Sequence, residues 1–131
     1  VGELDLLAGC PPCQGFSMIR TLNGKREIHD DRKDLVFEFV RLVKELHPKA
    51  IMMENVPGLK SDTRMEIVVQ ELKKLGYKFN DKSIQVLNVA HYGVPQRRRR
   101  MILMAAKKSL IPFAEPLKSV KTVRDTIAAL P

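Results

Sequence analysis

Residues 34–53 read DLVFEFVRLVKELHPKAIMM and pass from a helical pattern to a strand pattern. Apolar residues recur in the first part at helical spacing and predict one buried helix face. The residues predicted for that face are Leu35, Phe39, Leu42, Val43 and Leu46. Pro48 ends the helix, and residues 50–53 form a continuous apolar run that is typical of a buried strand. This stretch therefore predicts a helix that leads directly into a strand.

Similar patterns lie on both sides of this stretch. Residues 4–8 and 101–105 are apolar runs that predict two further strands, and residues 78–89 show partial alternation that predicts one or two more. Residues 63–66 match a capping box, and the apolar periodicity that follows ends at Gly76. This order of strands and helices predicts the α/β class, in which helices cover a sheet.

Residues 107–131 have a different composition. Pro112 and Pro116 indicate a connector, and Thr122 is placed to cap a short last helix. The apolar positions of that helix are Val123, Ile127 and Leu130.

The composition is that of one small globular domain. The chain has 131 residues, of which 44% are hydrophobic and 29% charged. No apolar run approaches the roughly 20 residues of a membrane span, and no signal-peptide pattern opens the chain. Two cysteines cannot form a disulfide framework, so we expect a cytoplasmic location. Trp is absent and aromatic residues make up only 5%, which disfavours a stacking platform for single strands.

The positive charge is concentrated in the last third of the chain. The formal net charge is +8; residues 86–131 hold 9 basic and 2 acidic side chains, whereas residues 1–85 hold 14 and 13. The centre of this excess is the arginine run 97–100. Such clustering indicates a surface for a polyanion, although a solvated basic patch without a ligand would have the same composition.

Cys10 and Cys13 form a C-x-x-C pair with several possible meanings. A zinc site is disfavoured because it needs four ligands, there is no second Cys pair, and His29, His47 and His91 lack ligand spacing. We therefore expect no metal. A redox pair would follow a strand as here, but it would normally open a helix rather than a loop. Both cysteines could also be small buried hydrophobic residues.

Nucleophilic catalysis by Cys13 is the remaining interpretation. Cys13 and Glu54 each follow a predicted strand, and groups at the carboxyl ends of strands gather at one edge of an α/β sheet. A thiolate that attacks an electrophilic carbon needs a nearby acid, which Glu54 supplies if partial burial favours its protonated form. With a basic strip for phosphate, these groups suggest thiolate attack on a nucleobase.

Three motifs occur in a fixed order along the chain: GCPPCQGFS at 9–17, ENV at 54–56 and QRRRR at 96–100. Asp31 and Arg32 lie between the first two. In residues, order and spacing this set resembles the catalytic motifs of the cytosine-5 DNA methyltransferases, of the type found in bacterial and archaeal restriction–modification systems. The resemblance covers nearly the whole chain.

The resemblance implies a fold and a reaction. The fold is part of the Rossmann-like sheet of an S-adenosylmethionine-dependent methyltransferase. The reaction transfers a methyl group from S-adenosylmethionine to C5 of a cytosine flipped out of double-stranded DNA. By this resemblance Cys13 adds to C6, Glu54 binds and protonates the base, and Arg100 contacts its O2 atom, while Arg98 holds the loop or a phosphate.

The same resemblance implies the other site residues. Pro12 and Leu35 match positions that line the cofactor. The positions that match substrate-side residues are Gln14, Ser17, Asn55 and Gln96. Gln14 and Ser17 belong to a loop that closes over DNA, and Asn55 braces the site. Cys10 is interpreted as non-catalytic, and Arg97 and Arg99 as solvated or facing phosphate.

The glycine-rich loop that opens the family's cofactor domain is not found in these residues. We therefore interpret 1–131 as one partial catalytic domain that lacks the cofactor-loop half, with 107–131 as a connector toward a target-recognition domain. It would be an excised piece or one part of a split enzyme. Two alternatives stay open: a tRNA cytosine-5 methyltransferase of the same superfamily, and a nucleic-acid-binding fragment without turnover.

Overall fold

The computed structural model describes residues 4–12 and 35–130, and four strands in these ranges form one sheet in the order β1-β2-β4-β3. The strands are β1 (Leu6–Gly9), β2 (Ala50–Asn55), β3 (Ile84–Asn88) and β4 (Arg99–Ala106). β1 is parallel to β2, whereas β4 is antiparallel to both of its neighbours. As a result, the carboxyl ends of β1, β2 and β3 and the amino end of β4 share one edge of the sheet, which we call the carboxyl edge.

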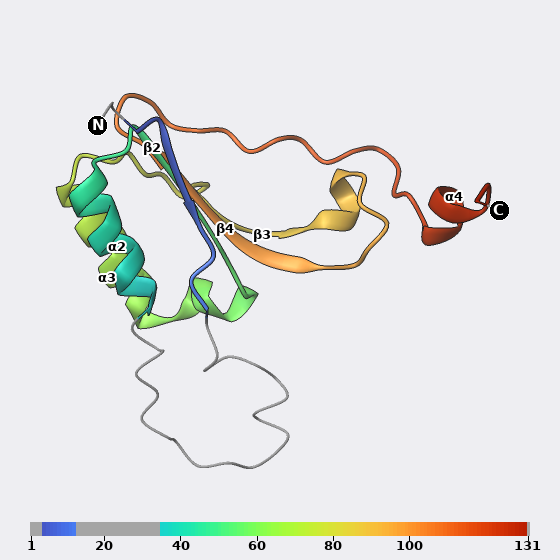
Figure 1. The fold of residues 1–131 in the computed structure, drawn as a ribbon, viewed down its shortest axis with the longest axis horizontal. Helices are drawn as coiled ribbons and strands as arrows, with labels where there is room; N and C mark the ends of the chain where they lie inside the picture. Colours follow the sequence, from blue (N-terminus) through green and yellow to red (C-terminus); the bar gives the residue numbers. More distant parts are fainter. Residues whose placement is uncertain (1–3, 13–34, 131) are drawn as a thin grey trace, which may run out of the picture.

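Two long helices, α2 (Leu35–Leu46) and α3 (Thr63–Lys74), lie on the same side of the sheet (Figure 1). Between them and the strands lies the hydrophobic core. Its most completely buried side chains include Val36, Val43, Ile51, Met53, Leu72, Met101 and Leu103. This arrangement confirms the α/β prediction. No helix in the described ranges combines the length and the apolar character that a membrane crossing requires.

The buried face of α2 differs from the predicted one. The buried stripe consists of Val36, Phe39, Val40 and Val43. Leu42 and Leu46 are 36% and 46% exposed, so their assignment to the buried face was wrong. The helix carries two overlapping apolar stripes, and only contact with the sheet and α3 selects one of them.

The start of α3 also differs in detail. The predicted capping box began at Thr63, but the N-cap is Asp62, whose carboxylate accepts a hydrogen bond from the Arg64 backbone N–H at 2.9 Å. The same carboxylate bonds the Arg64 guanidinium at 2.7 Å, and this second contact favours Asp62 over Thr63 as the cap. Gly76 follows the helix with a φ of +89°, which confirms the predicted end.

Beyond β4 the chain runs without helix or strand to the short helix α4 (Val123–Ile127). Thr122 caps α4 as predicted, and Thr122 and Asp125 form a reciprocal capping box. Ile111 and Phe113 of this segment are half-buried, whereas its apolar side chains from Leu117 onward are exposed, and α4 lies away from the four strands (Figure 1).

Candidate functional site

The carboxyl edge brings the second and third sequence motifs together. The strand was predicted to end at residue 53, but Glu54 and Asn55 are the last two residues of β2. The strand is longer because β4 pairs with it to the end: Glu54 lies opposite Ile102, and Asn55 lies opposite Met101. The antiparallel direction of β4 thus places the arginine run beside the ENV motif.

Glu54 and Arg100 form an ion pair at this edge. The distance between Glu54 Oε1 and Arg100 Nε is 2.7 Å, and the side chains are 26% and 23% exposed. Glu54 lies opposite Ile102, so Arg100 is its diagonal neighbour on the same face of the sheet, within reach of a long side chain. A half-buried pair of this kind presents a hydrogen-bonding acid and a fixed cation side by side.

Asn55 ties two strand ends together. It is only 4% exposed, and its Nδ2 donates a hydrogen bond to the Pro11 carbonyl at 2.8 Å. Its Oδ1 accepts from the Val56 N–H at 2.9 Å. The amide therefore attaches the segment after β1 to the end of β2, close to the exposed Pro12. Cys13, Gln14 and Ser17, which follow, lie outside the described residues.

Three of the four arginines in the run differ from Arg100. Arg97, Arg98 and Arg99 are exposed, and no acidic partner is found for them among the residues that the structure describes. Gln96 is exposed as well, and its backbone N–H donates to the Val94 carbonyl at 2.7 Å. These side chains face solvent in a region of high positive charge.

Gly9, the first residue of the GCPPCQGFS motif, has a structural role that sequence analysis missed. A Cβ atom there would lie 2.8 Å from Phe39 Cδ2, so glycine permits the close approach of β1 to α2 at this edge. Cys10 is exposed, which excludes the alternative that both cysteines are buried. Within 4–12 and 35–130, no group of three or more His, Cys, Asp or Glu side chains is arranged to hold a metal ion.

The expected cofactor positions are Pro12, which is exposed after β1, and Leu35, which begins α2. Their side chains are apolar and form no hydrogen bonds, so these side chains could supply only apolar contacts to a cofactor.

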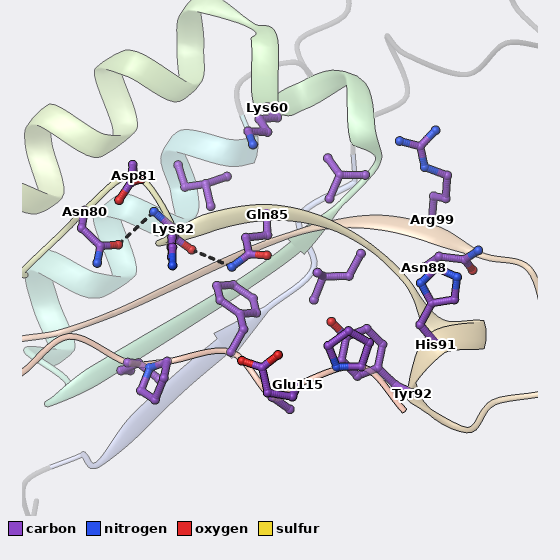
Figure 2. A pocket seen from close by; sticks show the side chains of 18 of the residues that line it. Lys60, Asn80, Asp81, Lys82, Gln85, Asn88, His91, Tyr92, Arg99 and Glu115 are labelled. Carbon is purple, nitrogen blue, oxygen red and sulfur yellow. Dashed lines mark hydrogen bonds between the residues drawn. The ribbon is translucent and has the colours of Figure 1, made fainter. Parts of the chain in front are cut away.

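A groove of about 860 Å³ lies between β3 and residues 110–116. In the view of Figure 2, Lys60 and Arg99 lie on one side of the β3 ribbon, and Tyr92 and Glu115 on the other. The groove shares Arg99 with the arginine run, but neither Glu54 nor Arg100 lines it. No local sequence pattern predicts this groove, because the connector folds back through a long-range bond from the Leu117 N–H to the His91 carbonyl at 2.8 Å.

The strand order and directions agree with a Rossmann-like methyltransferase fold, the class to which the solved structural neighbours belong. A solved structure of a protein encoded within an E. coli prophage, and described as a DNA modification methyltransferase, superposes with a TM-score of 0.69 at 31% identity. That superposition covers 99% of this chain and 36% of the other. Residues 1–129 match the family of C-5 cytosine-specific DNA methylases, and the chain belongs to that family.

Two curated relatives show the same relationship. The chain is 43% identical over 133 residues to the type II methyltransferase M.XorII of Xanthomonas oryzae, with 98% of this chain and 30% of the relative covered. It is 42% identical over 135 residues to the type II methyltransferase M1.HphI of Haemophilus parahaemolyticus, with 98% and 35% covered. The chain thus spans about a third of the length of these restriction–modification relatives.

Proposed function

We propose that this chain carries the catalytic centre of an enzyme that transfers a methyl group from S-adenosylmethionine to C5 of cytosine in DNA. The observation that supports this most directly is the 2.7 Å pair of Glu54 and Arg100. It lies beside Asn55, whose bond to Pro11 holds the beginning of the segment that continues to Cys13. The nucleophile, the acid and the cation of the reaction would then meet at one edge of the sheet.

In the proposed reaction the Cys13 thiolate adds to C6 of the base. This addition breaks the aromaticity of the ring and makes C5 nucleophilic. For this step Glu54 must give up its bond to Arg100 and take up a proton; its carboxyl group then donates that proton to N3 and its other oxygen accepts from the exocyclic amine, so that no full negative charge develops on the ring. S-adenosylmethionine supplies the methyl group when it is bound. A solvent base then removes the C5 proton, the Cys13 thiolate leaves C6, and N3 returns its proton to Glu54, which restores the aromatic ring.

The Glu54–Arg100 pair has a further role in this proposal. The two side chains are in direct contact at 2.7 Å, so a base that binds to both must replace their mutual bond. Arg100 then donates to O2 of the cytosine, and Glu54 turns to N3 and the amine. The ion pair thereby keeps both groups in place before the base arrives and exchanges their mutual bond for bonds to the base.

The remaining residues serve the nucleic acid and the cofactor. A cytosine in a duplex must be flipped out, which costs a few kcal/mol, and phosphate contacts by Arg97, Arg98 and Arg99 would hold the strand while this happens. Pro12 and Leu35 would line the cofactor. The side chains assigned to the substrate side are Gln14, Ser17, Asn55 and Gln96.

We also propose that residues 107–131 connect this partial catalytic domain, residues 1–131, to a target-recognition part of a longer enzyme. The support is the exposure of the apolar residues Val123, Ile127 and Leu130 on a segment that leaves the sheet. Such side chains are normally covered in a folded protein.

The covalent step is tested with duplex DNA that contains 5-fluorocytosine, because fluorine at C5 cannot be eliminated and the adduct accumulates. In the full-length enzyme we expect an adduct that is lost with Cys13→Ser and kept with Cys10→Ser. The opposite pattern would assign the nucleophile to Cys10. An RNA strand of the same sequence, trapped more readily than DNA, would favour the tRNA alternative.

The acid is tested with Glu54→Gln. Turnover should fall by about 10²-fold or more, as expected for the loss of a positioned acid, while the Kd for DNA stays within about twofold. Glu66→Gln on the exposed face of α3 is the matched control and should leave turnover unchanged. An equal loss of DNA binding and turnover would make Glu54 a structural residue.

A further inference from the structure

The two ends of the loop that contains the start of the Gln-x-Arg-x-Arg motif are joined by hydrogen bonds to one side chain. Residues 89–98 connect β3 to β4, beginning with the 3₁₀ helix η4 (Val89–Tyr92). Asn88 is the last residue of β3 and the N-cap of η4. Its Oδ1 accepts hydrogen bonds from the Ala90 N–H at 3.3 Å and from the Arg98 N–H at 3.1 Å. One amide oxygen thus joins the first turn of the loop to its last residue.

Arg98 is held by its backbone on both sides. Its N–H donates to Asn88, and its carbonyl accepts from the Val89 N–H at 3.0 Å. Its side chain, in contrast, is exposed and has no acidic partner among the described residues. The direction of the Arg98 side chain therefore depends on the backbone bonds at the base of the loop. Arg100 is held separately, by the β4 ladder opposite Leu87 and by its bond to Glu54.

The far part of the loop has its own restraints. Gly93 closes η4 with a φ of +84°, and the His91 carbonyl accepts from the Leu117 N–H. Loss of the Asn88 amide would therefore remove the restraint on the Arg98 N–H and the cap on the Ala90 N–H, while the Val89–Arg98 and Leu117–His91 backbone bonds remain. This separation distinguishes a positioning role from a purely structural one.

We infer that Asn88 is a positioning residue, which holds the Arg98 backbone so that its guanidinium meets a phosphate of the bound DNA strand. This inference rests on the proposed function, because it takes DNA as the ligand. Arg98 is the residue that contacts the DNA, and Asn88 acts only through it. The sequence motif QRRRR begins eight positions after Asn88, and only the hairpin brings the two together.

The experiment measures the Kd of the full-length enzyme for duplex DNA at several salt concentrations. Removal of one phosphate contact should reduce the slope of log K against log salt by about 1 and weaken binding at 0.1 M salt by about five- to tenfold. We expect Asn88→Ala to reproduce the effect of Arg98→Ala. The double variant should show no further loss, because both changes remove the same contact.

Two further variants complete the design. Asn80→Ala is the matched control: its Oδ1 accepts from the Lys82 N–H at 3.0 Å in the turn before β3, and its loss should leave the slope unchanged. Asn88→Ser keeps a neutral acceptor at the N-cap, so its slope should lie between those of the wild type and Asn88→Ala. It also provides a measurable variant if Asn88→Ala does not fold.

The inference is overturned if Asn88→Ala and Asn88→Ser keep the wild-type slope, if the effects of Asn88→Ala and Arg98→Ala add, or if Arg98→Ala alone leaves the slope unchanged. Failure of the proposed function gives a different result, because the 5-fluorocytosine adduct at Cys13 would then be missing. An enzyme that forms the adduct but keeps its salt slope in these variants would retain the proposed function and exclude the role of Asn88.

Discussion

Several basic side chains on the two long helices and the arginines at the start of β4 are in opposite electrostatic situations. On α2, Arg41 bonds Glu38 at 2.6 Å and Glu45 at 2.7 Å; between the helices, Lys44 bonds Glu71 at 2.8 Å. At the start of β4, residues 97–99 carry three exposed arginines without an acidic partner in the described ranges. Spacing within α2 and contact between the helices supply partners on one surface, whereas the positive charge of the other surface is not compensated by acidic side chains of the described residues.

Arg100 shows that neighbouring arginines need not act alike. Its partner Glu54 comes from β2, and the contact exists only because β2 and β4 are antiparallel neighbours. The run thus contains one arginine, Arg100, that is paired with Glu54, and three arginines that face solvent. A uniform basic patch would contain no such division.

The largest effect is expected on the salt dependence of DNA binding, when arginines without an acidic partner are removed. The double variant Arg97→Ala/Arg99→Ala should reduce the slope of log K against log salt for duplex DNA by about 1 to 2 units in the full-length enzyme. Its matched control is Arg41→Ala/Lys74→Ala, which removes the same charge from paired positions on the helices. The control should leave the slope unchanged. Equal slopes for the two double variants would show that net charge alone governs binding.

A smaller effect, on the free energy of unfolding, is expected from a change at the start of α3. Asp62→Ala removes the N-cap and the contact with Arg64, and should lower the free energy of unfolding by about 1 kcal/mol. The Arg64 guanidinium holds the pKa of Asp62 below its usual 3.8. This contribution is therefore present above pH 3.8 and is lost as the pH falls through the lowered pKa of the folded state.

The measurement is urea unfolding of the full-length enzyme at neutral and acidic pH. Asp62→Asn keeps a capping oxygen and serves as the control, with a smaller loss at neutral pH. Equal unfolding free energies for Asp62→Ala and the wild type at neutral pH would contradict the capping role.

The smallest effect on stability is expected from the ion pairs that Glu71 forms with lysines of the two helices. Lys44 and Lys74 both bond Glu71 and lower its pKa from 4.5 to about 2. Lys44→Ala should raise that pKa toward 4.5, as followed by the chemical shift of the Glu71 carboxylate during acid titration. Lys73→Ala on the same helix is the control. Because the pair is open to solvent and salt, we expect little change in the midpoint of thermal unfolding.

Several elements could be predicted from local pattern. The helices around residues 35–46 and 63–74 and the strands around 50–55 and 99–106 were expected close to their observed places. The N-cap of α3 and the buried face of α2 were not, because neighbouring residues compete for these roles and tertiary contacts decide between them. The groove beside β3 depends on a bond between residues 91 and 117, and no local pattern encodes it.

The amino-acid sequence by itself determined the α/β class, the order of the three motifs and the family, since these follow from periodicity and residue identity along the chain. Only the tertiary structure decided that Glu54 meets Arg100, that Asn55 holds Pro11 and that Asn88 holds Arg98. The physical reason is strand direction. An apolar run predicts a strand of either sense, and the sense is set by pairing between residues far apart in the chain.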